Sequence, residues 1–276
     1  MEADIVAKGA QISIAIIGGT GVYSLADGGV QELISTPFGE VKVVRQVLED
    51  RDVVFIPRHG EKHHLAPHEV NYRGNIWALA SLGVNQIIAT QAVGSMDAHF
   101  PPRSFVALSD FLDFTRNRPS TFFAGDNMPV HHVDVSTPYC PNLIQTLISA
   151  AADIGLSVAK DGIYSCMEGP RFETPAEIRM LTMLGANLVG MTSVPEVVLA
   201  REVGICYASL SIVCNWAAGI TTAPLDESEV TDIMEECGAD VRMIIRQYLR
   251  LAKTAACSCV NDKMRSAVLS IPVIRK

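Results

Sequence analysis

The sequence predicts a single α/β domain with a mixed, largely parallel central sheet flanked by helices. Short apolar runs alternate with helical patterns along most of the chain, as expected for strands that are joined by helices. Hydrophobic residues make up 49% and charged residues 19% of the 276 residues, a composition that supports a large core and argues against disorder. No Ser/Gly linker, change in composition or internal repeat divides the chain, so residues 1–276 are expected to form one domain.

The first half of the chain contains three expected strands, each followed by a loop with polar or glycine residues. The strands are expected over residues 12–17, 53–56 and 86–90, where apolar residues run without interruption. A helix is expected over residues 71–82, with Gly83 at the position of a C-terminal cap. In α/β sheets, the loops that follow the strands line the crevice where ligands bind.

The second half repeats the alternation. Strands are expected near residues 163–166, 188–190 and 207–213, and helices after Pro141, near residues 174–175 and after Pro195. A last long helix is expected from about Glu229, because apolar residues then recur at helical spacing as far as Tyr248. The chain from about residue 254 is expected to be a mobile tail.

Charge and hydropathy exclude several classes of partner. The net charge is −8, and no stripe of Lys and Arg could follow a phosphate backbone, so nucleic acid is not an expected partner. No apolar stretch reaches the roughly 18 residues of a membrane span. The acidic N-terminus lacks the pattern of a signal peptide, so a cytoplasmic location is expected. The seven cysteines include no C-x2-C pair, although Cys257 and Cys259 leave a disulfide in the tail open.

Two segments that follow strands are suited to an anion. In Gly18-Gly19-Thr20-Gly21, backbone N–H groups and a hydroxyl can approach a phosphate, although a tight turn between strand and helix explains these residues equally well. The segment does not match the dinucleotide fingerprint, because Ser24 stands where the third glycine belongs, and this disfavours a nicotinamide-binding domain. Arg58 and His59 combine a bidentate cation with an imidazole, a pair that suits a phosphate dianion.

Four histidines lie close together in the sequence, at positions 59, 63, 64 and 68. Pro57, Gly60 and Pro67 interrupt any single helix here, and the nearby Glu61 and Glu69 do not form a zinc-type helix motif. We therefore expect solvated loop histidines at 63, 64 and 68, and no metal site.

A second set of motifs combines a tight turn, an aromatic ring, a carboxylate and an amide. It comprises residues 167–174, residues 190–196 and the pair Cys214-Asn215. With these motifs the chain resembles the trimeric purine nucleoside phosphorylase and methylthioadenosine phosphorylase family from Ile16 to about residue 250. The motifs that carry the resemblance are Ile17-Gly18-Gly19-Thr20-Gly21, Arg58-His59-Gly60, Asn71-Tyr72-Arg73, Asn75-Ile76-Trp77-Ala78-Leu79, Gly169-Pro170-Arg171-Phe172, Met191-Thr192 and Val194-Pro195-Glu196.

The resemblance implies a phosphorylase/hydrolase-like fold and phosphate-dependent cleavage of the N-glycosidic bond of a purine nucleoside. Phosphate is implied as the co-substrate, with no metal or organic cofactor, and the active unit as a homotrimer or a dimer of trimers with shared sites. By position in the motifs, the phosphate ligands are Thr20, Arg58, His59, Gln91, Ala92 and Thr192. Phe172, Glu173 and Asn215 face the base, and Met191 lies against the ribose. Glu173, Asn215 and His59 are the expected catalytic residues.

Two positions favour a 6-oxopurine base. Members of the family that act on adenosine-type nucleosides carry Asp at the positions of Asn215 and Ala217, and Ser at the position of Glu173. An Asn amide can donate to O6 or N7, whereas a carboxylate repels a 6-oxo group. Glu173 can accept the N1–H that hypoxanthine and guanine carry and adenine lacks. Sites built to bond a particular group can reject analogues without that group by about 10⁴-fold.

The residues expected near the 5′ end of the sugar do not decide which nucleoside is the substrate. Val230, Ile233 and Met234 resemble the pocket for a methylthio group, although their spacing also fits a helix core, and His132 matches the position that reaches a neighbouring subunit's sugar. These residues suggest 5′-methylthioinosine, with inosine or guanosine close behind. The motifs also leave open a 5′-methylthioadenosine phosphorylase, a non-catalytic nucleoside or phosphate sensor and, because Gln91 replaces a small hydroxyl residue, a nucleoside hydrolase.

Overall fold

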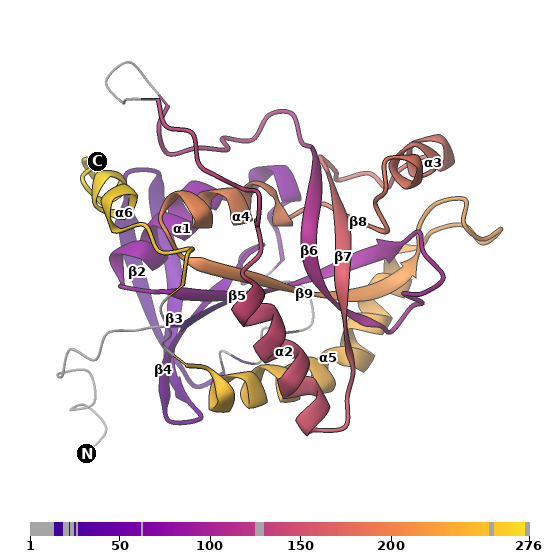
Figure 1. Ribbon diagram of the computed structural model, residues 1–276, viewed down its shortest axis with the longest axis horizontal. Coiled ribbons are helices and arrows are strands. Elements are labelled where there is room, and N and C mark those ends of the chain that lie inside the picture. The colour runs from indigo at the N-terminus through magenta and orange to yellow at the C-terminus, as the bar shows by residue number, and fades with distance from the viewer. Residues whose placement is uncertain are drawn as a thin grey trace.

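The computed structural model describes residues 14–18, 22, 25, 27–61, 63–124, 130–253 and 257–273. Within these ranges the strands are β1 (Ile14–Gly18), β2 (Val30–Thr36), β3 (Gly39–Leu48), β4 (Arg51–Pro57), β5 (Gln86–Ser95), β6 (Phe105–Phe114), β7 (Val158–Met167), β8 (Leu188–Gly190) and β9 (Cys206–Trp216). The α-helices are α1 (Tyr72–Ser81), α2 (Pro141–Asp153), α3 (Pro175–Met183), α4 (Ser193–Glu202), α5 (Glu227–Leu251) and α6 (Asp262–Leu269). The predicted single α/β domain is confirmed in its fold class (Figure 1).

One mixed sheet joins all the described strands in the order β2-β3-β4-β1-β5-β8-β7-β6-β9. Strands β4, β1, β5 and β9 run parallel to their neighbours in that group, whereas β2, β3 and β4 form an antiparallel meander. Because β5 pairs with both β8 and β9, the strands β5, β8, β7, β6 and β9 close into a ring. This ring brings the carboxyl ends of the parallel strands β5 and β9 beside the short strand β8, which runs antiparallel to β5.

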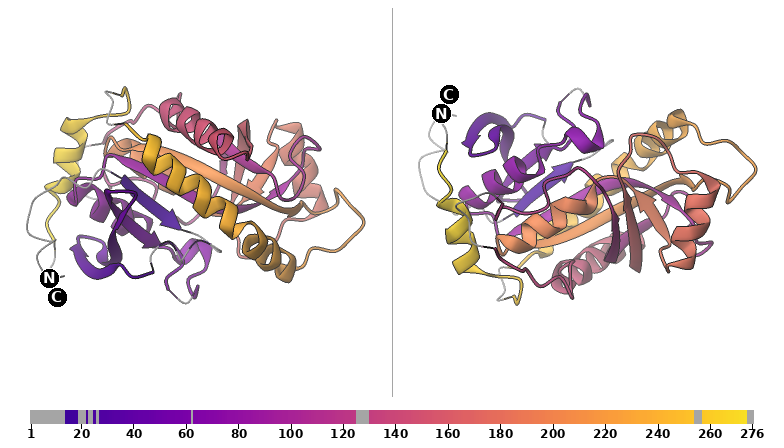
Figure 2. Two further views of the ribbon diagram at one scale, coloured as in Figure 1. Left: turned by 90° about the horizontal axis from the view of Figure 1, so that it is seen from below. Right: turned by 90° about the horizontal axis from the view of Figure 1, so that it is seen from above.

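Helices cover both faces of the sheet. Helices α2 and α5 pack on one face, and α1 and α4 pack on the other, as the two views in Figure 2 show. Side chains of β1 alternate between the two layers: Ile14 and Ile16 join the cluster under α2 and α5, and Ala15 and Ile17 join the cluster under α1 and α4. Both faces are therefore buried, and the central strands accordingly read as unbroken apolar runs.

Strand β5 extends beyond the predicted segment. The apolar run predicts a strand over residues 86–90, but pairing with β9 continues to Ser95 across a register shift between Val93 and Gly94. Gln91 and Ala92 therefore belong to a strand rather than to the loop after it. Because the strand continues, the backbone of Gln91 and Ala92 lies close to the loops that follow the neighbouring strands.

The C-terminal region is more ordered than the sequence predicts. Residues 262–269 lie in the expected mobile tail, yet they form helix α6, which packs beside α1 (Figure 1). Met264 and Val268 are buried in the core, and the indole N–H of Trp77 donates to the Val268 carbonyl at 3.2 Å. This part of the expected tail is a packed element. No helix in the described ranges is both long and apolar enough to cross a membrane.

Candidate active site

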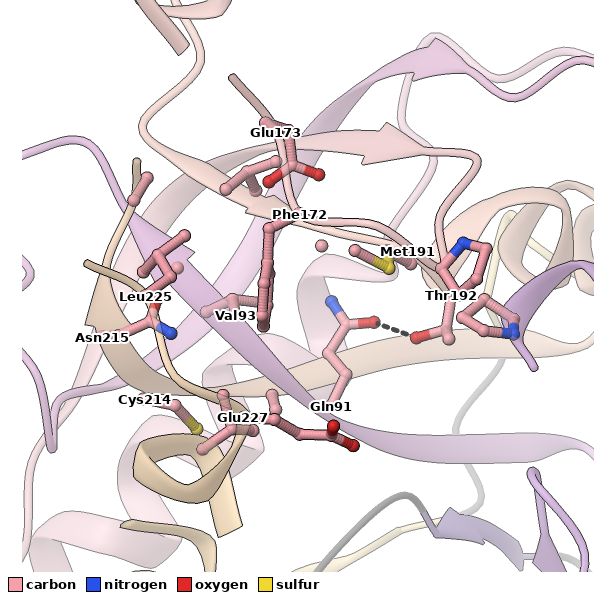
Figure 3. Close-up of a pocket in the computed structure, with 18 of the residues that line it drawn as sticks. Gln91, Val93, Phe172, Glu173, Met191, Thr192, Cys214, Asn215, Leu225 and Glu227 are labelled. Carbon is pink, nitrogen blue, oxygen red and sulfur yellow. Dashed lines mark hydrogen bonds between the residues drawn. The ribbon is translucent and has the colours of Figure 1, made fainter. Parts of the chain in front are cut away.

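A cavity of about 350 Å³ opens at the carboxyl ends of β4, β5, β8 and β9. The loop after β7 and the first turn of α5 complete its wall. The lining residues thus come from several separate segments of the chain, the first at residue 58 and the last at residue 230 (Figure 3). Its size lies in the usual range for a site that encloses a small molecule. Its place matches the crevice that α/β sheets present at the ends of their strands.

The cavity gathers most of the residues that the sequence singles out. Those that line it are Arg58, His59, Gln91, Ala92, Phe172, Glu173, Met191, Thr192, Asn215 and Val230. Thr20 lies outside the described residues. Ile233 and Met234 do not line the cavity; they are buried in the core between α5 and the sheet. His132 is exposed on the surface of its own chain, away from the cavity.

Arg58 is held at the cavity wall by a buried carboxylate. Its Nε and Nη2 donate to the two carboxylate oxygens of Glu196 at 2.9 and 2.8 Å, and Nη1 donates to the Thr90 carbonyl at 2.8 Å. Burial works against the charge, but the contact with Glu196 raises the pKa of Arg58 above its ordinary value. These bonds use three of the five N–H groups of the guanidinium and leave one on each terminal nitrogen. The ion pair with Glu196 thus fixes a permanent positive charge at the cavity wall, and the two remaining N–H groups can donate to a ligand.

The sequence did not single out Glu196 as a functional residue. Its carboxylate also accepts a hydrogen bond from the Tyr207 hydroxyl at 2.7 Å. Arg58 and Tyr207, the two residues that donate to this carboxylate, are both buried. A signal was present, because an acidic residue interrupts the apolar run from Val194 to Leu199. A carboxylate at a buried position requires a positive partner.

His59 is neutral at neutral pH. Burial, followed by the adjacent charge of Arg58, lowers the pKa of His59 to about 4. The ring lies 2.8 Å through Nδ1 from the Leu65 carbonyl, which can only accept, so Nδ1 carries the proton and Nε2 is a hydrogen-bond acceptor. Arg58 therefore supplies the charge at this end of the cavity, and His59 suits a hydroxyl of the ligand.

We expect His59 to make the protein less stable in mild acid. The unfolded histidine binds a proton below about pH 6.5, whereas the folded one resists until about pH 4. Stability is therefore present above pH 6.5 and is lost as the pH falls, by roughly 3 kcal/mol at most for this group. Urea denaturation of the wild type and of His59→Asn from pH 7 to pH 4 measures this loss. If the free energy of unfolding changed with pH to the same extent in both proteins, the assigned role of His59 would be contradicted.

Thr192 and Gln91 form the next part of the wall. The Thr192 hydroxyl donates to Gln91 Oε1 at 3.4 Å, and Gln91 Nε2 donates to the Ser211 hydroxyl at 3.2 Å (Figure 3). The Thr192 backbone N–H donates to the Tyr164 hydroxyl at 3.0 Å. The side chain of Gln91 is thus tied to strand β9 through Ser211 and to the loop after β8 through Thr192. It leaves an amide N–H for a ligand close to Arg58.

The opposite end of the cavity presents Glu173 and Asn215. Glu173 Oε1 is buried and has no hydrogen-bond partner among the described residues, and burial raises the pKa of this carboxyl. Asn215 is 5% exposed. Gly94 permits its approach, because a Cβ at that position would lie 2.9 Å from Asn215 Oδ1. The ring of Phe172 projects into the space between these polar groups and Met191 (Figure 3).

Arg118 holds together two loops that contribute to the cavity wall. Its Nη1 donates to the carbonyls of Met191 and Val194 at 2.6 and 3.0 Å, and its Nη2 donates to the Glu168 carbonyl at 2.6 Å. The loop after β7 and the loop after β8 are therefore cross-linked by one buried guanidinium. No feature of the sequence around Arg118 distinguishes it from a surface arginine.

The third region of the wall is partly polar. Its residues are His63, Pro67, Leu225, Glu227 and Val230. The His63 ring lies against that of His59, with centroids 4.6 Å apart. His63 and Glu227 were not expected at the site; the sequence indicated only a solvated loop histidine and the start of a helix.

Comparisons with known proteins find relatives that cover most of the chain. A probable 6-oxopurine nucleoside phosphorylase of Moorella thermoacetica is 49% identical over 252 residues, which cover 89% of this chain and 96% of that protein. A probable S-methyl-5′-thioinosine phosphorylase of Methanosarcina acetivorans is 49% identical over 247 residues, covering 89% of this chain and 93% of that protein. The crystal structure of methylthioadenosine phosphorylase from Schistosoma mansoni in complex with adenine superposes with a TM-score of 0.84 at 31% identity, covering 94% of this chain and 97% of that chain.

The family match covers almost all of the domain. Residues 13–250 match the phosphorylase superfamily, and this range includes every residue that lines the cavity. It also agrees with the resemblance that the sequence motifs indicate. The chain therefore belongs to the phosphorylase superfamily.

Proposed function

We propose that this protein is a 6-oxopurine nucleoside phosphorylase. It cleaves the N-glycosidic bond of a nucleoside with phosphate and releases the free base and ribose-1-phosphate, or the 5-methylthio analogue of that sugar. The observation that carries the proposal is that Glu173 and Asn215 line the same cavity, and that the buried Oε1 of Glu173 has no hydrogen-bond partner among the described residues. Inorganic phosphate is the co-substrate, and the chemistry needs no metal or organic cofactor.

The two polar groups at the base end complement a 6-oxopurine. A buried acceptor without a partner costs about 1–3 kcal/mol, and more when the group is charged. The N1–H of hypoxanthine or guanine satisfies Glu173 Oε1, whereas adenine offers a lone pair at N1 and leaves the oxygen unpaired. The amide of Asn215 can donate to O6 or N7 of the same ring. The ring of Phe172 supplies an apolar face for the purine.

The other end of the cavity suits the nucleophile. Cleavage builds positive charge on the sugar and negative charge on the departing purine. A phosphate bound by Arg58 and the Thr192 hydroxyl lies beside the sugar and stabilises the first charge. The Asn215 amide stabilises the second, because a donor fixed in advance acts most strongly where charge develops. Neutral His59 accepts a hydrogen bond from a hydroxyl of phosphate or sugar.

An adenine-specific enzyme is the alternative that the site disfavours. The structural neighbours include methylthioadenosine phosphorylases at about 31% identity, whereas the relatives at 49% identity are named for 6-oxopurine nucleosides or methylthioinosine. Glu173 and Asn215 agree with the second group, because N1 of adenine has no N–H to donate to Glu173 and adenine lacks the O6 to which the Asn215 amide can donate. A sensor without activity is disfavoured by the retained phosphate end.

The wall beyond the sugar accommodates more than one 5′ group. Pro67, Leu225 and Val230 offer an apolar surface for a methylthio group, and His63 and Glu227 offer partners for a hydroxyl. Apolar pockets discriminate against an added hydroxyl by only about 10²-fold. We therefore infer that both inosine and 5′-methylthioinosine are substrates. The exposed His132 remains available to the site of a neighbouring subunit in a homotrimer.

Base release from four nucleosides tests the proposal. Inosine, guanosine, 5′-methylthioinosine and 5′-methylthioadenosine are each incubated with and without phosphate, and the free base is quantified by chromatography. We expect phosphate-dependent release of hypoxanthine and guanine, with kcat/KM for adenine release lower by at least about 10³-fold. Inosine and methylthioinosine should differ by no more than about 100-fold. Dominant release of adenine would contradict the base assignment, and no turnover of any nucleoside would favour the sensor.

A further inference from the structure

Four cysteines far apart in the sequence meet at the end of the sheet opposite the nucleoside cavity. They are Cys140, Cys206, Cys257 and Cys259, and all four sulfur atoms lie within 4.8 Å of one another. The sequence shows no sign of a metal centre, because no pair has the C-x2-C spacing. None of the four lines the nucleoside cavity, where Cys214 is the only cysteine among the described residues.

We propose that these four thiolates form a structural site for one Zn²⁺ ion. In a tetrahedral tetrathiolate site the Zn–S bonds are about 2.3 Å, which places the sulfur atoms about 3.8 Å apart. The sulfur atoms of Cys140 and Cys257 are 3.6 Å apart, and no two of the four sulfur atoms are more than 4.8 Å apart. Four sulfur atoms that converge on one point offer a closed coordination shell, the arrangement typical of structural rather than catalytic zinc.

Three of the four cysteines are buried among packed elements of the fold. Cys140 precedes the first residue of α2, and its N–H donates to the Tyr207 carbonyl at 2.8 Å, which ties it to the start of β9 beside Cys206. Cys140, Cys206 and Cys259 are buried. Two ligands on the core and two on one loop are a favourable arrangement for a metal cross-link.

The outer shell also fits a metal. The Asn142 amide donates to the Cys257 sulfur at 3.8 Å, the kind of contact that orients a thiolate ligand. A cavity of about 390 Å³ reaches Cys140, Cys206 and Cys257 and gives an ion a path of entry. Lys253 lines the same cavity, and its positive charge offsets part of the −2 charge of a zinc tetrathiolate.

The site would tie the C-terminal segment to the core. Cys257 and Cys259 lie between α5 and α6, whereas Cys140 and Cys206 belong to the junction of α2 with β9. Binding exchanges four thiol protons for one Zn²⁺, so four S–H bonds break, four Zn–S bonds form and four protons enter solution. No oxidant is needed, and the sulfur atoms keep their oxidation state.

Metal analysis of the purified full-length protein tests the proposal. The protein is prepared with a reducing agent, zinc is supplied in slight excess, and unbound metal is removed. We expect about one zinc per chain by mass spectrometry of the metal, and a cobalt-substituted form with the visible and near-ultraviolet bands of tetrahedral thiolate ligation. Cys257→Ser and Cys259→Ser should lose the metal, while the matched control Cys237→Ser, a buried cysteine on α5 outside the cluster, keeps it.

Two results would overturn the zinc site. One is a reduced protein with free thiols that takes up no zinc or cobalt. The other is a protein isolated with disulfides among these cysteines that stays free of metal after reduction and addition of zinc. The metal readout does not depend on nucleoside cleavage, so failure of the proposed function and failure of the zinc site can be told apart.

Discussion

Replacing Asn215 with aspartate is expected to lower kcat/KM for inosine by about 10²- to 10³-fold, the usual effect of removing one donor that stabilises developing charge. The change keeps the size of the side chain, so its packing against Gly94 is retained. It turns a donor into a carboxylate that repels O6 and can accept the 6-amino group of adenine. Adenine release from methylthioadenosine should therefore rise relative to hypoxanthine release. Steady-state kinetics with both nucleosides measure the ratio.

Asn215→Ala is the matched control for the charge. It removes the donor without adding a carboxylate, so inosine cleavage should fall and adenine release should gain nothing. Adding Glu173→Ser to Asn215→Asp should increase adenine release further, because the buried oxygen that opposes N1 of adenine is removed. Wild-type inosine kinetics in the Asp variant would show that Asn215 does not contact the base.

Arg58→Met is expected to lower the free energy of unfolding by about 3–5 kcal/mol, the usual cost of leaving one charge of a buried ion pair without its partner. Both members are essentially inaccessible, at 1% and 0% exposed side-chain area, so water cannot replace the lost contacts. Urea denaturation at a fixed protein concentration measures the loss. The variant should also bind phosphate poorly.

The double variant Arg58→Met/Glu196→Gln separates the two roles of the arginine. Glutamine keeps an acceptor for the Tyr207 hydroxyl but carries no charge, so most of the stability should return. The KM for phosphate should stay raised by about 10- to 100-fold, because a hydrogen bond to a charged group contributes about 1.5–3 kcal/mol. A stable double variant with wild-type phosphate kinetics would assign Arg58 to structure alone.

The sequence predicted β1, β4, β5, β7, β8 and β9, but not β2, β3 or β6. Strands such as β1 and β9 are covered on both faces, and their apolar runs are therefore unbroken and easy to read. Strand β2 lies at the edge, with exposed Val30 and Leu33 among polar residues, and its pattern predicts no strand. Helix α6 was missed because few residues anchor it, chiefly Met264 and Val268.

The site was predictable where a residue follows a strand directly. Arg58, His59 and Thr192 come just after β4 and β8, so the alternation of strands and loops already placed them at one edge of the sheet. Their roles as ligands remain predictions. Glu196 and Arg118 were missed because their importance lies in partners distant in the chain; Glu196 bonds to a residue 138 positions away. The cysteine cluster was not predicted for the same reason, because its members come from segments that are distant in the sequence.

The most direct test of the proposed reaction is the identity of the sugar product from inosine. The protein is incubated with inosine and phosphate, hypoxanthine is quantified, and ³¹P NMR follows the phosphate. We predict ribose-1-phosphate in equal amount to hypoxanthine, and negligible base release when phosphate is left out. Hypoxanthine released with free ribose, at a rate independent of phosphate, would contradict the account and identify a hydrolase.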